Sequence, residues 1–365
     1  MFKTKKSASG LTKSSMYFDQ LRRVKPKTEE ITLEDAKPQL DEILDFLEFS
    51  EDYTTAAVGD ALNDLVTIPE DMSAKLTQQD LTKNRGAIGV YLQEKNYATL
   101  FVKIVTSLKS HVRVNAKVKF TDTLKNFKSV LRGFCNYTAW CPQLQKDFGT
   151  TGGIAVLFPL LEYIDKNLTQ CDPESKAVVL IEEILLFLIP ICQNCIKYCP
   201  ENLGAYRAAN AFQILSNIKS TDKNVKLLAL LTLAYVVDDK QSQSLSKSHD
   251  CIQLLTEMLE ECLKSPDHSI IIHPMCYSIR EILDGLNHLT INDENKVEMK
   301  KHGGVKIISQ LVEDEGFSDE EKQLAVNAFQ NLAFVKSIRE TSEVQDAVKC
   351  KNGVIVDKIS VQQFV

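Results

Sequence analysis

The chain has 365 residues, of which 44% are hydrophobic and 25% charged, and its net charge is −6. This is the composition of an ordinary soluble globular protein, and the 10 prolines and 14 glycines argue against an all-β or a disordered chain. Leu, Ile, Lys, Glu and Gln at helical spacing dominate, whereas clean period-2 runs between turn dipeptides are hard to find. We therefore expect an all-α protein.

The N-terminal segment is strongly basic. Residues 1–28 contain eight Lys or Arg side chains against one acidic residue, Asp19. This segment is rich in Ser and Thr and weakly apolar, so we predict a flexible basic arm over residues 1–30, with nuclear import or nucleic-acid binding as the alternative role. It lacks the apolar core of a secretory signal, so we expect a cytoplasmic protein with reduced thiols, the nucleus being the alternative location.

After the arm, residues 31–130 read as weak helical repeats, with helices beginning near Ala36 and near Asn96. The most apolar run of the chain lies further on, in "AVVLIEEILLFLIPI". It contains two glutamates and Pro190 and is too short to span a bilayer. We predict that it forms a buried helix and that the protein does not insert into membranes.

An internal repeat becomes clear from residue 131. In two segments that align without gaps, an asparagine precedes a Gly-Gly pair, sixteen residues before its first glycine, and the apolar positions behind the glycines coincide. A glycine pair adopts positive φ and lets two helices approach closely, so it suits a sharp turn between helices. The aligned segments are residues 134–161, with Asn136 and Gly152, and residues 285–312, with Asn287 and Gly303.

With this template, each unit reads as a short helix, a turn, a second helix, a polar loop and a longer third helix. Stacked units of this kind share a continuous core, which predicts an α-solenoid of about six units over residues 31–365. The repeats are clearer over residues 131–352, and the last, 353–365, is truncated. The second-glycine positions fall at Gly153, Gly204, Cys251, Gly304 and Gly353.

Cys192, Cys195 and Cys199 have the spacing of part of a zinc or iron–sulfur site. In the repeat frame they lie on the short first helix of a unit, between Pro190 and Pro200, within an arc of about 60° on one face. Cys192 and Cys199 would be about 10.5 Å apart along such a helix. Thiolates around one zinc ion lie about 3.8 Å apart. We therefore predict that these cysteines pack in the core and bind no metal.

Residues 302–334, "HGGVKIISQLVEDEGFSDEEKQLAVNAFQNLAF", resemble the armadillo-repeat family, which has Gly-Gly before its second helix and an A-L-x-N-L-A-like third helix. The resemblance covers about residues 130–355 and implies a right-handed α-solenoid of about six armadillo-like three-helix repeats, with a more irregular or HEAT-like array as the alternative. It implies that the third helices line a concave groove, where asparagines bond the backbone of an extended peptide. Members of the importin-α type place a tryptophan four residues before such asparagines. In this chain those positions hold Arg132, Leu283 and Asn327, so we do not expect a nuclear-import receptor. The partner-binding residues implied are Asn136, Asn287, Asn331 and Arg132.

No phosphate-binding glycine motif and no His-x3-His or His-Glu-x2-His pattern is present. His268 and His273 flank a proline-containing loop, and we do not expect a metal there. Acidic pairs on the helices read as solvated faces. We therefore predict that the protein is not an enzyme and needs no cofactor, metal or small-molecule substrate.

The resulting prediction is a protein–protein interaction scaffold that binds an extended or helical segment of a partner in its groove. The alternative is the N-terminal armadillo-like part of a signalling adaptor whose TIR-like effector domain is absent from this chain. A third reading, nucleic-acid binding through the basic arm, is disfavoured because the rest of the chain is acidic.

Overall fold

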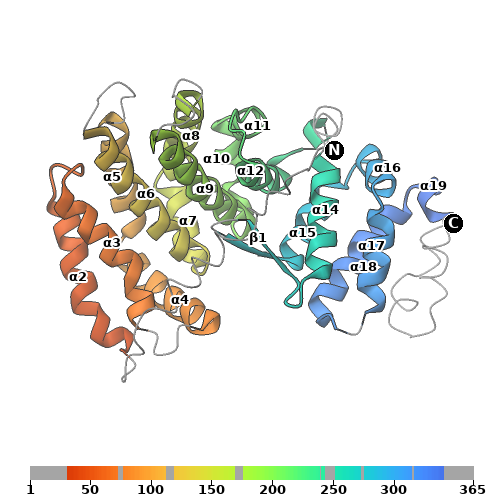
Figure 1. Cartoon of the computed structure of the whole chain (residues 1–365), viewed down its shortest axis with the longest axis horizontal. Coiled ribbons are helices and arrows are strands. Elements are labelled where there is room, and N and C mark those ends of the chain that lie inside the picture. The colour runs from red at the N-terminus through yellow and green to blue at the C-terminus, as the bar shows by residue number, and fades with distance from the viewer. Residues whose placement is uncertain are drawn as a thin grey trace, which may run out of the picture. The chain divides into compact units, whose positions relative to one another are not determined.

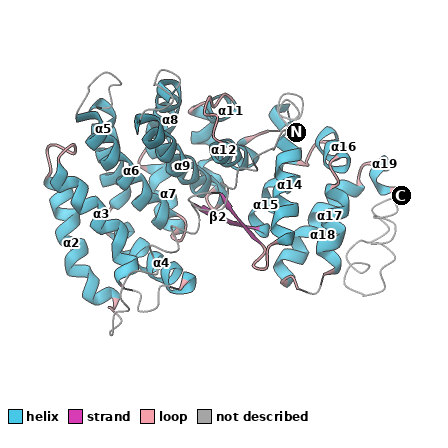
Figure 2. Cartoon of the chain, in the orientation of Figure 1, coloured by secondary structure: helices cyan, strands magenta, loops and turns pink. Residues whose placement is uncertain are grey.

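The structure is a computed structural model that describes residues 31–72, 77–111, 119–168, 176–238, 240–242, 251–272, 275–314 and 316–340. Helices make up nearly all of this part of the chain, as predicted, and one two-stranded hairpin interrupts them (Figure 2). The chain divides into two compact units, residues 1–156 and residues 157–365. The predicted arm, the Gly353 turn and the truncated last repeat lie outside the described residues.

The first unit begins with three helices that threonines cap. The side chains of Thr32, Thr55 and Thr77 each accept a hydrogen bond from a backbone N–H of the first turn, which fixes where each helix starts. Helices begin close to Ala36 and Asn96, as predicted. The helices of this unit are α2 (Leu33–Phe49), α3 (Ala56–Asp71), α4 (Gln78–Glu94), α5 (Tyr97–His111), α6 (Lys119–Thr138) and α7 (Pro142–Thr150) (Figure 1).

The core of the first unit forms where α3 packs against α6 and α5 packs against α6 and α7. Phe101 of α5 stacks on Phe134 of α6 with ring centroids 3.8 Å apart, and Phe148 of α7 meets both rings. At the edge of the unit, Asp41 of α2 accepts hydrogen bonds from the Tyr91 hydroxyl, at 2.7 Å, and from Lys95, also at 2.7 Å.

In the second unit, four helices that correspond to third helices of successive repeats pack each against the next, in the order α9, α12, α15, α18. The hairpin joins α14 to α15, and Ser269 pairs with Ser278 in its antiparallel register. The elements are α8 (Gly153–Leu168), α9 (Lys176–Lys197), η1 (Pro200–Asn202), α10 (Leu203–Ala208), α11 (Ala211–Ser216), α12 (Lys223–Val236), α14 (Cys251–Lys264), β1 (Ser269–Ile272), β2 (Met275–Ser278), α15 (Ile279–Leu289), α16 (Asp293–Lys301), α17 (Gly304–Glu313), α18 (Asp319–Ala333) and α19 (Lys336–Arg339).

The turns before the second helices depend on left-handed backbone. Gly152 and Gly303 have φ of +79° and +81°, as the Gly-Gly pairs predict, and α8 and α17 start directly after them. The prediction for Gly204 is wrong, because this glycine lies inside α10. There the left-handed residue is Asn210, with φ of +55°, and the second helix of the unit begins one residue later. Asparagine tolerates this conformation better than most residues, so it replaces glycine.

The cysteine-rich stretch is not a separate short helix. Helix α9 runs through Pro190 and contains Cys192 and Cys195, while Cys199 directly precedes η1. Proline inside a helix costs about 3 kcal/mol. The apolar residues around it are almost entirely buried, each contributing about 1.5–3 kcal/mol, so burial outweighs the cost. The predicted core packing is confirmed, because the three cysteines are at most 3% exposed.

Among the described helices, one has the length and composition that crossing a membrane would require. It is Val178–Lys197 within α9, with a mean hydropathy of 1.9, and it is longer than predicted because it continues through Pro190. Of its apolar window, 72% is buried inside the protein. It is thus the buried helix that the sequence predicts.

Candidate partner-binding surface

Two of the predicted binding residues lie on neighbouring third helices of the second unit. Asn287 is on α15 and Asn331 is on α18, and these two helices pack against each other. The Asn287 amide donates to the Leu324 carbonyl of α18 at 3.4 Å, a long hydrogen bond, while its Oδ1 is buried without a partner. Asn331 is partly exposed, and its side chain makes no hydrogen bond within the described chain. Within the part of the chain that the structure describes, neither carboxamide therefore has all of its hydrogen-bonding groups paired.

Capping and burial set the direction of these side chains. On α18, Ser318 and Glu321 form a capping box, and a face of apolar residues turns into the core. Asn327 and Asn331, one turn apart, lie away from that face, and Asn327 is exposed. Leu283 of α15, by contrast, is fully buried in the core. The surface of α15 and α18 therefore presents carboxamides and no tryptophan.

On the preceding third helices, α9 and α12, the residues at the position of Asn287 and Asn331 are buried and cannot contact a partner. Phe187 of α9 is 7% exposed. Thr232 of α12, which precedes Leu233 as Asn331 precedes Leu332, is fully buried and donates to a carbonyl of its own helix. Strand β1 packs against α12, and β2 packs against α15. Among the described residues of this unit, the third helices whose asparagine position stays partly exposed are therefore α15 and α18.

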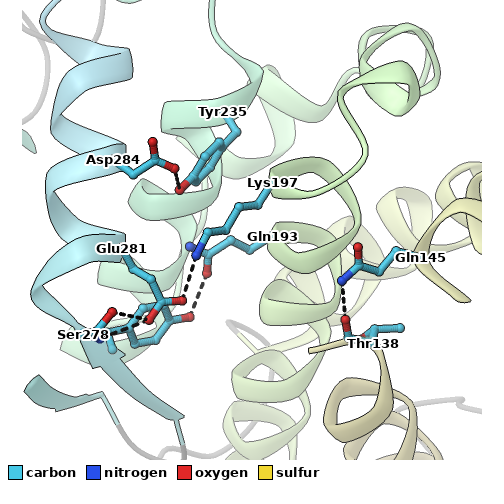
Figure 3. A network of polar contacts seen from close by, with 9 residues as sticks. Thr138, Gln145, Gln193, Lys197, Tyr235, Ser278, Glu281 and Asp284 are labelled. Carbon is cyan, nitrogen blue, oxygen red and sulfur yellow. Dashed lines mark hydrogen bonds and ion pairs between the residues drawn. The ribbon is translucent and has the colours of Figure 1, made fainter. Parts of the chain in front are cut away.

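Polar contacts fasten the hairpin to α9 (Figure 3). The hydroxyl of Tyr277 on β2 donates to Oε1 of Gln193 on α9 at 2.7 Å, and both residues are buried. The Nε2 group of Gln193 is also buried and has no hydrogen-bond partner among the described residues. A buried amide that keeps only one hydrogen bond depends strongly on that bond. Tyr277 therefore fixes where the hairpin lies against α9.

Two further polar contacts join α9 and α12 to α15. Lys197 of α9 forms an ion pair with Glu281 at 3.0 Å, and Glu281 also accepts the backbone N–H of Ser278 at the start of α15. Burial opposes the charge of Lys197, yet the neighbouring Glu281 leaves its pKa raised. Tyr235 of α12 donates to Asp284 at 2.7 Å, and burial together with this carboxylate raises the pKa of the phenol (Figure 3). The network holds α9, α12 and α15 in register.

The hairpin was not predicted from the sequence. A signal was present in the run Ile270 to Ile272, because β-branched residues favour strands. Both strands have only four residues, which is too short for a clear alternation pattern. Ile271 and Cys276, which face each other in the register, are exposed, whereas Tyr277 is buried.

The other two predicted residues lie in the first unit. Arg132 and Asn136 are one turn apart on α6 and both are partly exposed. Arg132 forms an ion pair with Glu70 of α3 at 3.9 Å, and Ser129 donates to Asn63 of α3 at 2.7 Å. These residues share the α3–α6 surface, so the structure brings Arg132 and Asn136 together on one polar face of this unit.

Within the described ranges, no group of three or more His, Cys, Asp or Glu side chains is placed to hold a metal ion. His268 stacks on the ring of Phe317 with centroids 4.0 Å apart. His273 lies outside the described residues. Burial raises the pKa of the Cys135 thiol to about 12, so this cysteine stays protonated at neutral pH.

No protein-family model matches the chain, and no curated protein matches it. Many solved structures are similar to it, among them the following three. A designed armadillo repeat protein in complex with the peptide (KR)4 has 14% identity and a TM-score of 0.44, over 80% of this chain and 99% of that one. A second designed armadillo repeat protein has 14% identity and a TM-score of 0.45 over the same shares. An engineered protein has 16% identity and a TM-score of 0.45, over 81% and 97% of the two chains. The chain is thus an all-α protein whose similar structures include armadillo repeat proteins, the family that its sequence pattern resembles.

Proposed function

We propose that the protein is a non-catalytic interaction scaffold, and that the surface of α15 and α18 binds an extended segment of a protein partner. The observation that carries this proposal is the pair Asn287 and Asn331, which lie at the same motif position of two packed helices and are both partly exposed. A carboxamide offers both a donor and an acceptor. It therefore matches the unpaired N–H and C=O groups of an extended peptide.

The spacing of the two helices suits such a ligand. Packed helices lie about 8–10 Å apart, and an extended chain advances about 3.3 Å per residue. Asparagines on neighbouring helices would therefore contact peptide residues about three positions apart. Since Thr232 of α12 is buried, the peptide gains no equivalent contact there. Affinity would then depend on few anchors, and losing both asparagines should be easy to measure.

The test uses the full chain and a random peptide library displayed for selection, followed by fluorescence polarisation with the selected peptides. The double variant Asn287→Ala/Asn331→Ala should weaken binding about tenfold or more, because each lost hydrogen bond contributes about 1 kcal/mol. Asn217→Ala, an exposed asparagine at the end of α11, is the matched control and should stay within about twofold of the wild type. Equal affinities for the double variant and the control would refute the proposed surface.

We also propose a cytoplasmic location, with the nucleus as the alternative, and we keep the adaptor as the second form of the same function. A tagged protein viewed in cells tests the location. Sequencing the transcript downstream of codon 365 tests the adaptor, because that form requires an effector domain in the same polypeptide.

A further inference from the structure

The outer face of α2 exposes two aromatic rings. The opposite face packs against α3, α4 and α5, and its buried residues are Ala36, Leu40, Ile43, Leu44 and Leu47. Phe46 and Phe49 lie on the outer face and are 43% and 81% exposed. Residues three or four positions apart are neighbours on a helix surface, so the exposed Glu42 and Asp45 lie beside these rings. We call Glu42, Asp45, Phe46 and Phe49 the α2 stripe.

The α2 stripe is acidic as well as aromatic. Residues 31–51 contain seven carboxylates and one cation, Lys37. Lys37 and Lys95 form ion pairs with other carboxylates of α2. In the described part of the chain, by contrast, no Lys or Arg side chain forms an ion pair with Glu42 or Asp45. Two rings beside two carboxylates match a segment that carries both apolar side chains and arginines, because a guanidinium binds carboxylates and also stacks on aromatic faces.

The chain itself contains a segment with this chemistry. Residues 1–28 have eight Lys or Arg side chains against one acidic residue, so their formal charge is +7. Within them, residues 16–25 read "MYFDQLRRVK" and combine apolar, aromatic and basic side chains. The arginines Arg22 and Arg23 directly follow Leu21, and Phe18 lies a few positions earlier. A strongly basic segment and an acidic surface of the same chain attract each other.

The connection between this segment and α2 is long enough for a contact with the α2 stripe. Glu42 and Phe49 lie about 14 Å and about 24 Å along the helix from Leu33. The seven residues 26–32 span up to about 25 Å when extended. Lys25 can therefore reach any part of the α2 stripe if the chain reverses direction before Leu33. Such a tether gives the segment an effective concentration of about 1 mM, which favours it over a separate basic partner.

We propose that the α2 stripe is the docking site for residues 16–25 of the same chain. The apolar and aromatic side chains of the segment cover the rings of Phe46 and Phe49, and its two arginines form charge-assisted hydrogen bonds with the carboxylates of Glu42 and Asp45. Removal of the two rings from water drives docking, while the carboxylates select a basic segment. This contact lies within the first unit and is independent of the proposed function of α15 and α18.

The experiment uses the full chain with the photo-cross-linking residue p-benzoylphenylalanine in place of Phe18. After irradiation, mass spectrometry of the digested protein identifies what the residue touches. We expect a cross-link within one chain to the α2 peptide that contains Phe46 and Phe49. Phe46→Ser/Phe49→Ser should lower its yield about fivefold or more, because the docked segment loses its apolar contacts. Val179→Ser is the matched control, since Val179 of α9 is 57% exposed, and its yield should stay within about twofold of the unsubstituted chain.

A charge exchange tests the ionic part of the contact. Arg22→Glu/Arg23→Glu should lower the cross-link yield about fivefold or more, and adding Glu42→Arg/Asp45→Arg to the same chain should restore most of it. Recovery requires the two pairs of residues to face each other, so a general effect on folding would not produce it. Circular dichroism and thermal unfolding establish that each variant is folded.

The proposal fails if the cross-link falls outside α2 or if none forms. It also fails if Phe46→Ser/Phe49→Ser and Val179→Ser give equal yields, or if the charge exchange restores nothing. Cross-links that join two chains, seen as a band of doubled mass, would assign the arm to a second copy and overturn the contact within one chain. Because the α2 stripe lies in the first unit, these failures would leave the proposed function of α15 and α18 standing.

Discussion

Replacing Tyr277 by Phe tests how firmly the hairpin is attached to α9. The change removes one hydroxyl, whose hydrogen bond to Gln193 is 2.7 Å long between residues that are 3% and 2% exposed. The Nε2 group of Gln193 already has no partner, so the variant leaves the whole carboxamide buried without a hydrogen bond. Loss of the bond together with this unsatisfied group should lower the free energy of unfolding by about 1–3 kcal/mol. Urea unfolding followed by circular dichroism measures it.

A double-mutant cycle separates this cause from a loss of packing. Gln193→Met keeps an unbranched side chain of similar length and removes the amide. If the unsatisfied amide causes the damage, Tyr277→Phe/Gln193→Met should be more stable than Tyr277→Phe alone, by about 1 kcal/mol or more. Additive effects of the two substitutions would refute the reasoning, because they would mean that the two side chains do not interact.

Three further predictions concern the backbone, the thiols and pH. Gly303→Ala should lower the free energy of unfolding by about 1–2 kcal/mol, because the φ of Gly303 is +81° and strains any residue with a Cβ; the added Cβ itself would meet no atom within 4 Å. Gly204→Ala, inside helix α10, is the control. It should be neutral or stabilising when both variants are unfolded in urea. Iodoacetamide at pH 8 should modify the exposed Cys276 and spare Cys135, whose pKa is about 12, in peptide mass maps; fast labelling of both would contradict the buried position. Hydrogen bonds from Lys95 and Tyr91 lower the pKa of Asp41. The stabilising contribution of Asp41 is therefore present above the ordinary pKa and is lost as the pH falls through the lowered value. Asp41→Asn should therefore make stability fall less between about pH 5 and pH 2, and unchanged acid curves would refute this.

The repeat could be read from the sequence wherever its turn residues are glycines. Gly152 and Gly303 have the positive φ that their pairs predict, because only glycine adopts this conformation without strain. In the unit of α10 and α11, Asn210 has the same left-handed conformation. Because glycine was expected at this turn, Gly204 was assigned to it, and the predicted helices of that unit were displaced along the sequence. Asparagine also occurs often in other backbone conformations, so Asn210 marks this turn in the sequence less clearly than Gly152 and Gly303 mark theirs.

The errors at Pro190 and at the hairpin have a different cause. Local preference favours ending a helix near a proline, yet the continuous burial of α9 outweighs that preference, and such burial depends on neighbours far away in the chain. The hairpin depends in the same way on Gln193, which lies 84 positions before Tyr277. The repeat pattern predicts that Asn287 and Asn331 lie on third helices. It does not predict that Thr232, at the same position of α12, is buried.

The contact between Tyr277 and Gln193 also bears on how the second unit unfolds. In a repeat protein each layer touches only the next, so the layers can melt one after another from an end. Here Tyr277 and Glu281 both reach α9 across 84 residues of chain, past the layer that contains α12. Opening of α9 or α15 alone would break these contacts at once. We therefore expect the layers from α9 to α15 to lose amide protection against hydrogen exchange together, as one cooperative block.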